Sequence, residues 1–84
     1  MNARDAKTLA AVFKHPAPAN LEWSAVEALL LAIGCSLVDG SGSRVRFVKD
    51  DMIATFHRPR PAKEAKRYQV RAARDYLIRL GVKP

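Results

Sequence analysis

The sequence predicts a single α+β domain over residues 1–84, with helices on one face of a small antiparallel sheet. Two observations indicate this class: apolar residues recur at helical spacing towards both ends of the chain, and their period changes to two in the middle. A third is the length, because 84 residues bury only one modest core. The expected order is helix, helix, three strands and helix, in two layers.

The first helix is expected from about Ala3 to Lys14. Pro16 and Pro18 follow it, and proline cannot continue a helix because it lacks the backbone donor and clashes with the preceding turn. Residues 1–20 are therefore predicted to be an N-terminal helix with a proline-rich connector. The apolar stripe of this helix is Ala6, Leu9, Ala10 and Phe13.

The second helix is expected to begin at Ala25. Ser24 and Glu27 have the capping-box spacing, in which a hydroxyl and a carboxylate satisfy the free amides of a first turn. Trp23, just before them, is expected to fold back on that turn, and Gly34 suits the left-handed residue after a helix end. The buried stripe is Val26, Leu29, Leu30 and Ile33.

Three strands are expected after Cys35, with residues 49–51 as the hairpin turn between the second and the third. Side chains alternate between the two faces of a strand, so each strand has an inward and an outward set. The inward set is Leu37, Val45, Phe47, Ala54 and Phe56, and the outward set is Arg44, Arg46, Thr55 and His57.

Residues 58–61 read Arg-Pro-Arg-Pro and are expected to leave the sheet as an extended loop, because proline lacks a donor for the ladder. A last helix follows and ends before Gly81. One face of this helix carries apolar residues, and another carries arginines that can bind successive phosphates of a nucleic acid. The alternative is that these arginines, with Glu64 and Asp75 nearby, form an ordinary solvated helix face. The apolar residues are Val70, Ala73, Leu77 and Leu80, and the arginines are Arg67, Arg71 and Arg74.

Charge predicts a polyanionic partner, because the net charge is +7 and the excess begins at Arg44, while residues 1–42 are close to neutral. RNA or DNA fits this charge, and an acidic protein partner is the alternative. The lone Cys35 is expected to be a buried thiol in a protein of the reducing cytoplasm. The longest apolar run is too short for a membrane span, so no membrane association is expected.

The candidate chemistry uses no metal and no small-molecule cofactor, because no metal-ligand spacing and no phosphate-binding glycine loop before a helix is present. His57 is the candidate for proton transfer, with a structural or solvated histidine as the alternative. Arginine can hold a phosphate through two hydrogen bonds. A histidine together with such arginines can cleave RNA, because one group assists attack by the ribose 2′-hydroxyl while the arginines stabilise the charge that develops on the phosphate. The candidates for holding the phosphate are Arg44, Arg46, Arg58 and Arg60, with the hydroxyls of Ser41, Ser43 and Thr55.

Two motifs resemble the HicA family, the toxin half of HicAB toxin–antitoxin pairs. They are Gly-Ser-Arg-Val-Arg-Phe at residues 42–47 and Phe-His-Arg-Pro-Arg-Pro at residues 56–61. The approach to the first strand, with Glu27, Leu29, Leu30 and Gly34, is similar too, as is a final helix ending at Leu80 and Gly81. The resemblance covers a core at residues 23–82.

The resemblance implies a fold like that of double-stranded-RNA-binding domains, metal-independent cleavage of mRNA that inhibits translation, and neutralisation by a HicB antitoxin. It also implies a catalytic histidine where this chain has Arg44. Arginine stays protonated and is a poor general base, so either His57 supplies the proton transfer, or this chain acts differently, or it has lost cleavage. Three functions stay open: a ribonuclease toxin, an RNA-binding module of the same fold without catalysis, and a domain that docks an acidic protein.

Overall fold

The computed structural model describes the whole chain, residues 1–84. It confirms the predicted α+β class, with helices and one three-stranded antiparallel sheet in the expected order. The elements are α1 (Ala3–Val12), α2 (Trp23–Ala32), β1 (Ser36–Asp39), β2 (Arg44–Lys49), β3 (Met52–His57) and α3 (Arg67–Arg79).

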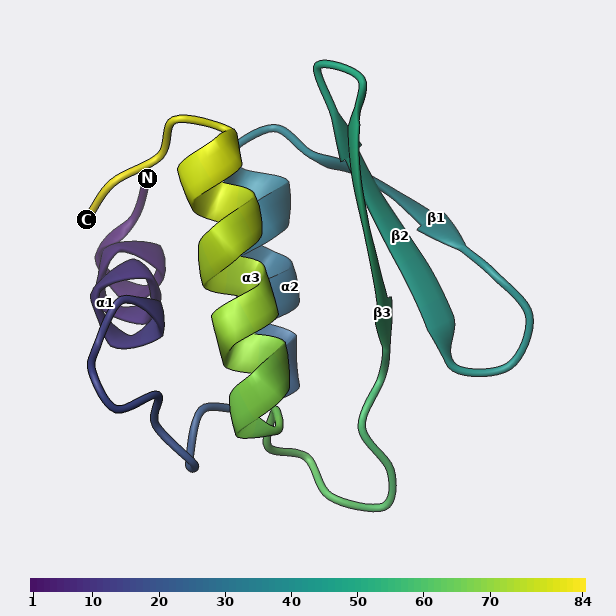
Figure 1. Ribbon diagram of the computed structural model, residues 1–84, viewed down its shortest axis with the longest axis horizontal. Helices are drawn as coiled ribbons and strands as arrows, with labels where there is room; N and C mark the ends of the chain where they lie inside the picture. The colour runs from purple at the N-terminus through teal and green to yellow at the C-terminus, as the bar shows by residue number, and fades with distance from the viewer.

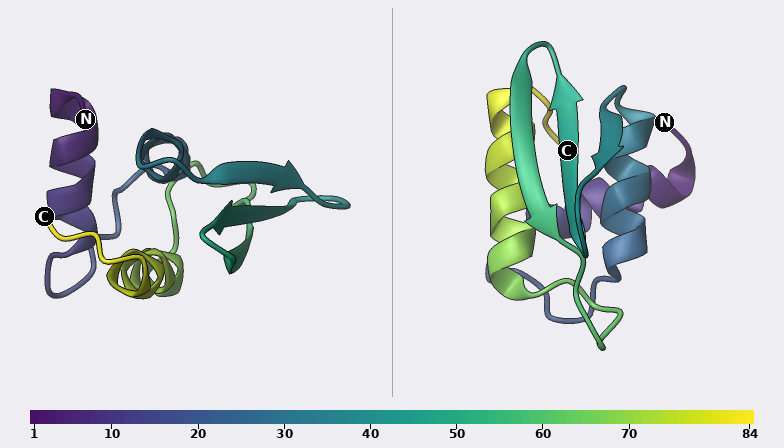
Figure 2. Two further views of the ribbon diagram at one scale, coloured as in Figure 1. Left: turned by 90° about the horizontal axis from the view of Figure 1, so that it is seen from above. Right: turned by 90° about the vertical axis from the view of Figure 1, so that its right-hand side faces the viewer.

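The elements form three layers, where two were predicted (Figure 1). Helices α2 and α3 lie side by side against one face of the sheet, and Figure 2 shows the other face of the sheet uncovered. Helix α1 packs on α2 and α3 from the side away from the sheet. The N-terminal helix is therefore an outer layer on the helices, distant from the open face of the sheet.

The register of the sheet confirms the predicted phase of its strands. Strand β2 lies between β1 and β3, with Arg44 opposite His57 and Arg46 opposite Thr55. Because side chains alternate along a strand, these four share the face that no helix covers. Of the inward set, Val45, Phe47 and Phe56 are buried, and Leu37 and Ala54 are half-buried against the core.

The hairpin between β2 and β3 turns through two residues, Asp50 and Asp51, where three residues were predicted. Both have positive φ angles, 52° and 64°. Two left-handed residues in a row make the turn that matches the twist of paired strands, and aspartate is among the residues that tolerate this conformation. The predicted turn lies in the right place, and Lys49 is the last residue of β2.

The core lies between the sheet and the two central helices. The predicted stripes are buried in α2 and α3, except that Ile33 and Leu80 at the ends of the two stripes are only half-buried. The Trp23 ring joins α2 to the sheet, because its centroid lies 5.2 Å from that of Phe56 on β3, which lies 6.0 Å from that of Phe47 on β2. The fully buried apolar residues of these stripes are Val26, Leu29, Leu30, Val70, Ala73 and Leu77.

Tyr76 is a core residue that the apolar spacing did not predict. Its hydroxyl lies 3.0 Å from the carbonyl oxygen of Met52, 3.2 Å from that of Phe47 and 3.8 Å from the sulfur of Cys35. Burial raises the pKa of Tyr76 to about 12, and burial also raises the pKa of the Cys35 thiol. Tyr76 therefore ties α3 to both strands of the hairpin, and Cys35 is buried as predicted.

Helix α1 ends at Val12, two residues before the predicted end, and its buried face is also different. Ala6 and Ala10 of the predicted stripe are exposed, while the polar residues Asp5 and Thr8 are buried beside Leu9 and Val12. The hydroxyl of Thr8 donates to the carbonyl oxygen of Arg4, so its burial does not leave a donor unsatisfied. Thr8 can occupy this interface because its hydrogen bond is made within the helix, whereas Oδ1 of the buried Asp5 has no hydrogen-bond partner.

Helix α2 begins at Trp23, two residues before the predicted start, and Ser24 does not cap it. The backbone N–H of Trp23 donates to the carbonyl oxygen of Lys63 at 2.9 Å, so the β3–α3 loop satisfies a donor of the first turn. The indole N–H of Trp23 donates to the carboxylate of Glu27. The capping-box interpretation is wrong because Ser24 already lies inside the helix and the Glu27 carboxylate accepts from Trp23 and Arg58.

Candidate functional site

The open face of the sheet carries a depression of about 560 Å³ beside the β1–β2 turn. It brings together the outward residues that the alternation predicted, and the facing pair of Arg44 and His57 lies on adjacent strands. All of its lining side chains are exposed, so a polyanion has direct access to them. The lining residues are Gly40, Ser41, Arg44, Arg46, Thr55 and His57.

The turn before β2 lets the chain pass close over Arg44. A Cβ atom on Gly40 would lie 3.2 Å from the Cβ of Arg44, and the N–H of Gly40 donates to the carbonyl oxygen of Arg44 at 2.9 Å. Gly42 has a φ of 65°, which a residue without a side chain adopts at no steric cost. The Gly-Ser stretch therefore allows the alkyl stem of Arg44 to lie against the turn, with its guanidinium at the depression.

His57 is the last residue of β3, and side chains from other elements hold this end of the strand. The amide Nε2 of Gln69 donates to the carbonyl oxygen of His57 at 2.6 Å, and its Oε1 accepts from the N–H of Lys66 at 2.9 Å. The next backbone N–H, that of Arg58, donates to the carbonyl oxygen of Ser43 at 2.9 Å. The position of His57 is thus fixed from α3 and from the β1–β2 turn.

Gln69 is a residue that sequence reasoning missed. It is buried, with 3% of its surface exposed, and both ends of its amide are hydrogen-bonded. The sequence held one signal for it. Gln69 lies three residues after Lys66, the N-cap of α3, and glutamine at this spacing is one half of the capping-box pattern. Its contact with the strand joins residues twelve positions apart, and local spacing does not reveal such a contact.

Arg58 lies apart from this depression, although it adjoins His57 in sequence. Its Nε donates to the Glu27 carboxylate at 2.8 Å, and its Nη1 donates to Asp39 at 3.0 Å. The hydrogen bond with Glu27 is the main cause that raises the pKa of Arg58. The charge of Arg58 is therefore balanced by two carboxylates, and its guanidinium joins α2, β1 and the end of β3.

Two of the three α3 arginines make hydrogen bonds that their spacing did not predict. Arg67 donates to the carbonyl oxygen of Ala17 at 3.2 Å, and Arg74 donates to those of Val12 and Lys14 at 2.9 and 2.7 Å. Cations at carbonyl groups of a helix C-terminus stabilise that end of the helix. Arg67 and Arg74 thus fasten α1 and its connector to α3, and only Arg71 of the three lacks such a contact.

Two further predicted phosphate ligands also lie outside the depression. Ser43 is half-buried in the turn, and Arg60 is exposed on the β3–α3 loop, beside the start of α2. No group of three or more histidine, cysteine or acidic side chains is arranged to hold a metal ion. None of the helices has both the length and the apolar character needed to cross a bilayer.

The protein is a small basic α+β domain with Arg44 and Arg46 exposed on the open face of the sheet, here called the cationic face. Its outer helix α1 lies away from that face. The sequence model of the family described as HicA toxin of bacterial toxin-antitoxin matches residues 23–82, which comprise α2, the sheet and α3. The chain belongs to this HicA toxin family and is the toxin component of a toxin–antitoxin pair. The family implies a HicB-type antitoxin as its partner. Among curated proteins and among solved structures, none matches the chain.

Proposed function

We propose that this HicA-family protein is an endoribonuclease that cleaves mRNA without a metal ion, and that Arg44, Arg46 and His57 act on the scissile phosphate. The observation that carries the proposal is the register of β2 and β3, which sets Arg44 directly opposite His57 at one depression. Facing residues on antiparallel strands have Cβ atoms about 5 Å apart. A guanidinium and an imidazole on such a pair can reach the same phosphate.

The proposed reaction divides two tasks between these side chains. Neutral imidazole of His57 accepts the proton of the ribose 2′-hydroxyl as its oxygen attacks phosphorus, and the imidazolium returns a proton to the departing 5′-oxygen. The bond between phosphorus and the 5′-oxygen breaks, which leaves a 2′,3′-cyclic phosphate and a 5′-hydroxyl. Arg44 and Arg46 hold the phosphate and stabilise the charge that grows on its oxygens.

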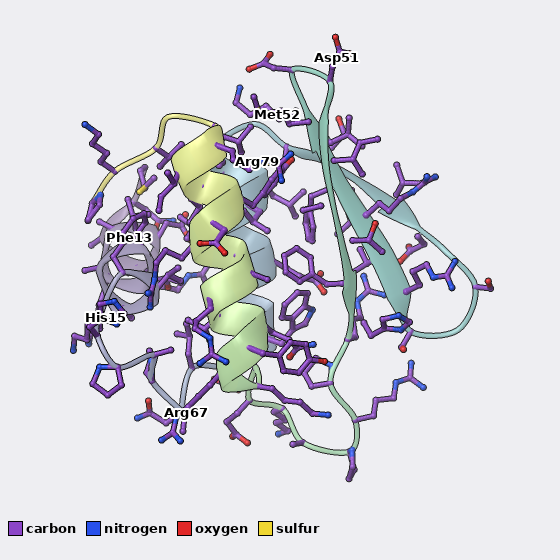
Figure 3. The ribbon with its side chains drawn as sticks, viewed as in Figure 1. Phe13, His15, Asp51, Met52, Arg67 and Arg79 are labelled. Carbon is purple, nitrogen blue, oxygen red and sulfur yellow. The ribbon has the colours of Figure 1, made fainter.

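The test is cleavage of a labelled mRNA by purified protein in the presence of a chelator, with RNA binding followed at two salt concentrations. His57→Ala should abolish cleavage and leave binding nearly unchanged. Arg44→Gln should weaken both and lower the slope of binding against salt by about one unit, because one phosphate contact is lost. His15→Ala is the matched control, since His15 lies on the connector, on the side of the molecule away from the sheet (Figure 3).

A second candidate function is an RNA-binding or antitoxin-binding module without catalysis. Arg44 favours it, because the family resemblance implies a histidine at this position and a protonated guanidinium does not accept a proton. This function predicts salt-dependent binding with no cleavage by wild type, and a His57→Ala protein as toxic in cells as wild type. Loss of toxicity in His57→Ala, with its RNA binding intact, contradicts it.

Neutralisation by the antitoxin is proposed to occur at the same open face. The exposed Arg44 and Arg46 attract an acidic partner as they attract a phosphate, and Val38 and Ile53, with 40% and 50% of their surfaces exposed, add apolar contact area on this face. Addition of the cognate HicB-type protein should then stop cleavage and compete with RNA for binding. An antitoxin that bound without displacing RNA would show that it docks elsewhere.

A further inference from the structure

A second cavity, of about 380 Å³, lies between the β3–α3 loop and the first turn of α2. Its volume falls within the range of small-ligand sites. Figure 1 shows this loop passing from the end of β3 round to the start of α2 and α3. Its lining includes Glu22, Trp23, Arg60, Pro61, Ala62 and Lys63.

The walls of this cavity are fixed by backbone hydrogen bonds at both ends of the loop. At the far end, Lys63 accepts from the N–H of Trp23 at 2.9 Å, and the N–H of Ala65 donates to Leu21 at 2.7 Å. At the near end, the N–H of Arg58 donates to Ser43 at 2.9 Å, and the guanidinium of Arg58 is held by carboxylates. A cavity of this kind is formed before its ligand arrives, which lowers the ordering cost of binding.

The chemistry of the lining suits a nucleotide. Arg60 and Lys63 are exposed and take part in no ion pair. Arg58, which also lines the cavity, is neutralised by two carboxylates. Glu22 is the one acidic residue of the lining. Prolines and Ala62 give the cavity an apolar wall beside these free cations. A base with its attached phosphate needs this combination of an apolar surface and a cation.

The two cavities lie on opposite sides of one strand end. His57 lines the depression on the sheet face, and the next residue, Arg58, lines the second cavity, because successive side chains of an extended chain point to opposite sides. An RNA strand whose scissile phosphate lies at Arg44 and His57 can therefore continue round the end of β3. Only a strand free of pairing can place a single base in a cavity of this size.

We propose that the second cavity is a subsite that binds an unstacked nucleotide next to the scissile phosphate, and that the substrate is consequently single-stranded RNA. This inference rests on the proposed ribonuclease function. Arg60 and Lys63 hold a phosphate on the flank of the cleaved bond, and the apolar wall receives the base. The cavity thus determines which single-stranded sites are cleaved efficiently.

The test compares kcat/KM on a short single-stranded RNA between a cavity variant and a control with the same loss of charge. The cavity variant is Arg60→Gln/Lys63→Gln, and the control is Arg4→Gln/Lys7→Gln on α1, away from the sheet. A third variant, Ala62→Leu, narrows the cavity without changing charge. Circular dichroism and thermal melting establish that every variant is folded.

The cavity variant should lose about ten- to hundredfold in kcat/KM, the size of a lost hydrogen bond between charged groups, while the control loses far less. Ala62→Leu should lose activity on the intact oligonucleotide but not on one that lacks the base beside the cleavage site. Duplex RNA of the same sequence should resist cleavage.

Two results would overturn the subsite, and they are distinguishable from failure of the ribonuclease proposal. If wild type cleaves, His57→Ala does not, and the cavity variants behave as the control does, the subsite is wrong and the function stands. Cleavage of duplex RNA at the single-strand rate would also refute the subsite alone. If wild type neither binds nor cleaves RNA, the proposed function fails and the subsite fails with it.

Discussion

Replacement of Gln69 tests how the fold holds His57. The buried amide of Gln69 donates to the carbonyl oxygen of His57 at 2.6 Å and accepts from the N–H of Lys66 at 2.9 Å. Glutamate at this position keeps an acceptor for Lys66 but loses the donor, and it sets a carboxylate against the His57 carbonyl. Leucine loses both hydrogen bonds. The two variants therefore separate the anchor on β3 from the cap on α3.

The magnitude follows from the partners that each variant leaves unpaired. A partly buried group without its hydrogen-bond partner costs about 1–3 kcal/mol. Gln69→Glu should lower the free energy of unfolding by about this amount, and Gln69→Leu by up to about twice as much. In a domain of this size each kcal/mol lowers Tm by about 4–8 °C. Thermal melting measures both losses.

Cleavage kinetics show whether Gln69 positions His57 or only stabilises the fold. A displaced proton-transfer group lowers kcat by about ten- to hundredfold, with KM nearly unchanged, because the phosphate contacts remain. Tyr76→Phe is the control: it also removes a hydrogen bond from α3 to β3, but at Met52, the opposite end of the strand. If both Gln69 variants are folded at the assay temperature and cleave as fast as Tyr76→Phe, the positioning role is refuted.

Two further predictions concern contacts that the structure assigns to stability. The pKa of Tyr76 is raised to about 12, so its hydroxyl contributes stability that is complete below about pH 10 and is lost as pH rises through about 12. The stability advantage of wild type over Tyr76→Phe should shrink across this window in denaturant titrations, with the exposed Tyr68→Phe as a control that stays level with wild type. Arg74→Gln should speed amide exchange in α1, because hydrogen bonds of a charged group are worth about 1.5–3 kcal/mol, and should leave cleavage unchanged. Arg71→Gln is the control and should leave amide exchange in α1 unchanged. If Arg74→Gln loses more RNA binding than Arg71→Gln does, Arg74 binds phosphate and the purely structural role is wrong.

The sequence predicted the parts of the fold that local period determines. Two-residue alternation placed Val45 and Phe47 inward and Arg44 and Arg46 outward, and this phase is sufficient to assemble the cationic face. The helical stripes of α2 and α3 were equally clear, because their apolar residues meet the sheet directly. A strand's phase has only two settings, so a few apolar residues decide it.

Contacts between distant residues account for what the sequence did not predict. Arg74 binds carbonyl groups 60 and 62 positions away, and Arg58 binds a glutamate 31 positions away. Spacing within one helix assigns such arginines to a face but does not show what that face meets. These long-range contacts place α1 on the outer side of α3, and they occupy donors of Arg67 and Arg74 that the sequence assigned to phosphate.

The proposed mechanism also yields a prediction about position 44, where the family resemblance implies a histidine. Positions 44 and 57 face each other across the β2–β3 ladder and line one depression, so an imidazole and a guanidinium can occupy them in either order. The double variant Arg44→His/His57→Arg should then cleave RNA within about tenfold of wild type, since both groups remain and only their strands are exchanged. His57→Arg alone should be inactive because it leaves two arginines and no proton acceptor. Arg44→His alone should still cleave. An inactive double variant that binds RNA and melts as wild type does would show that the two positions are not equivalent, and that the fixed end of β3 is what makes His57 effective.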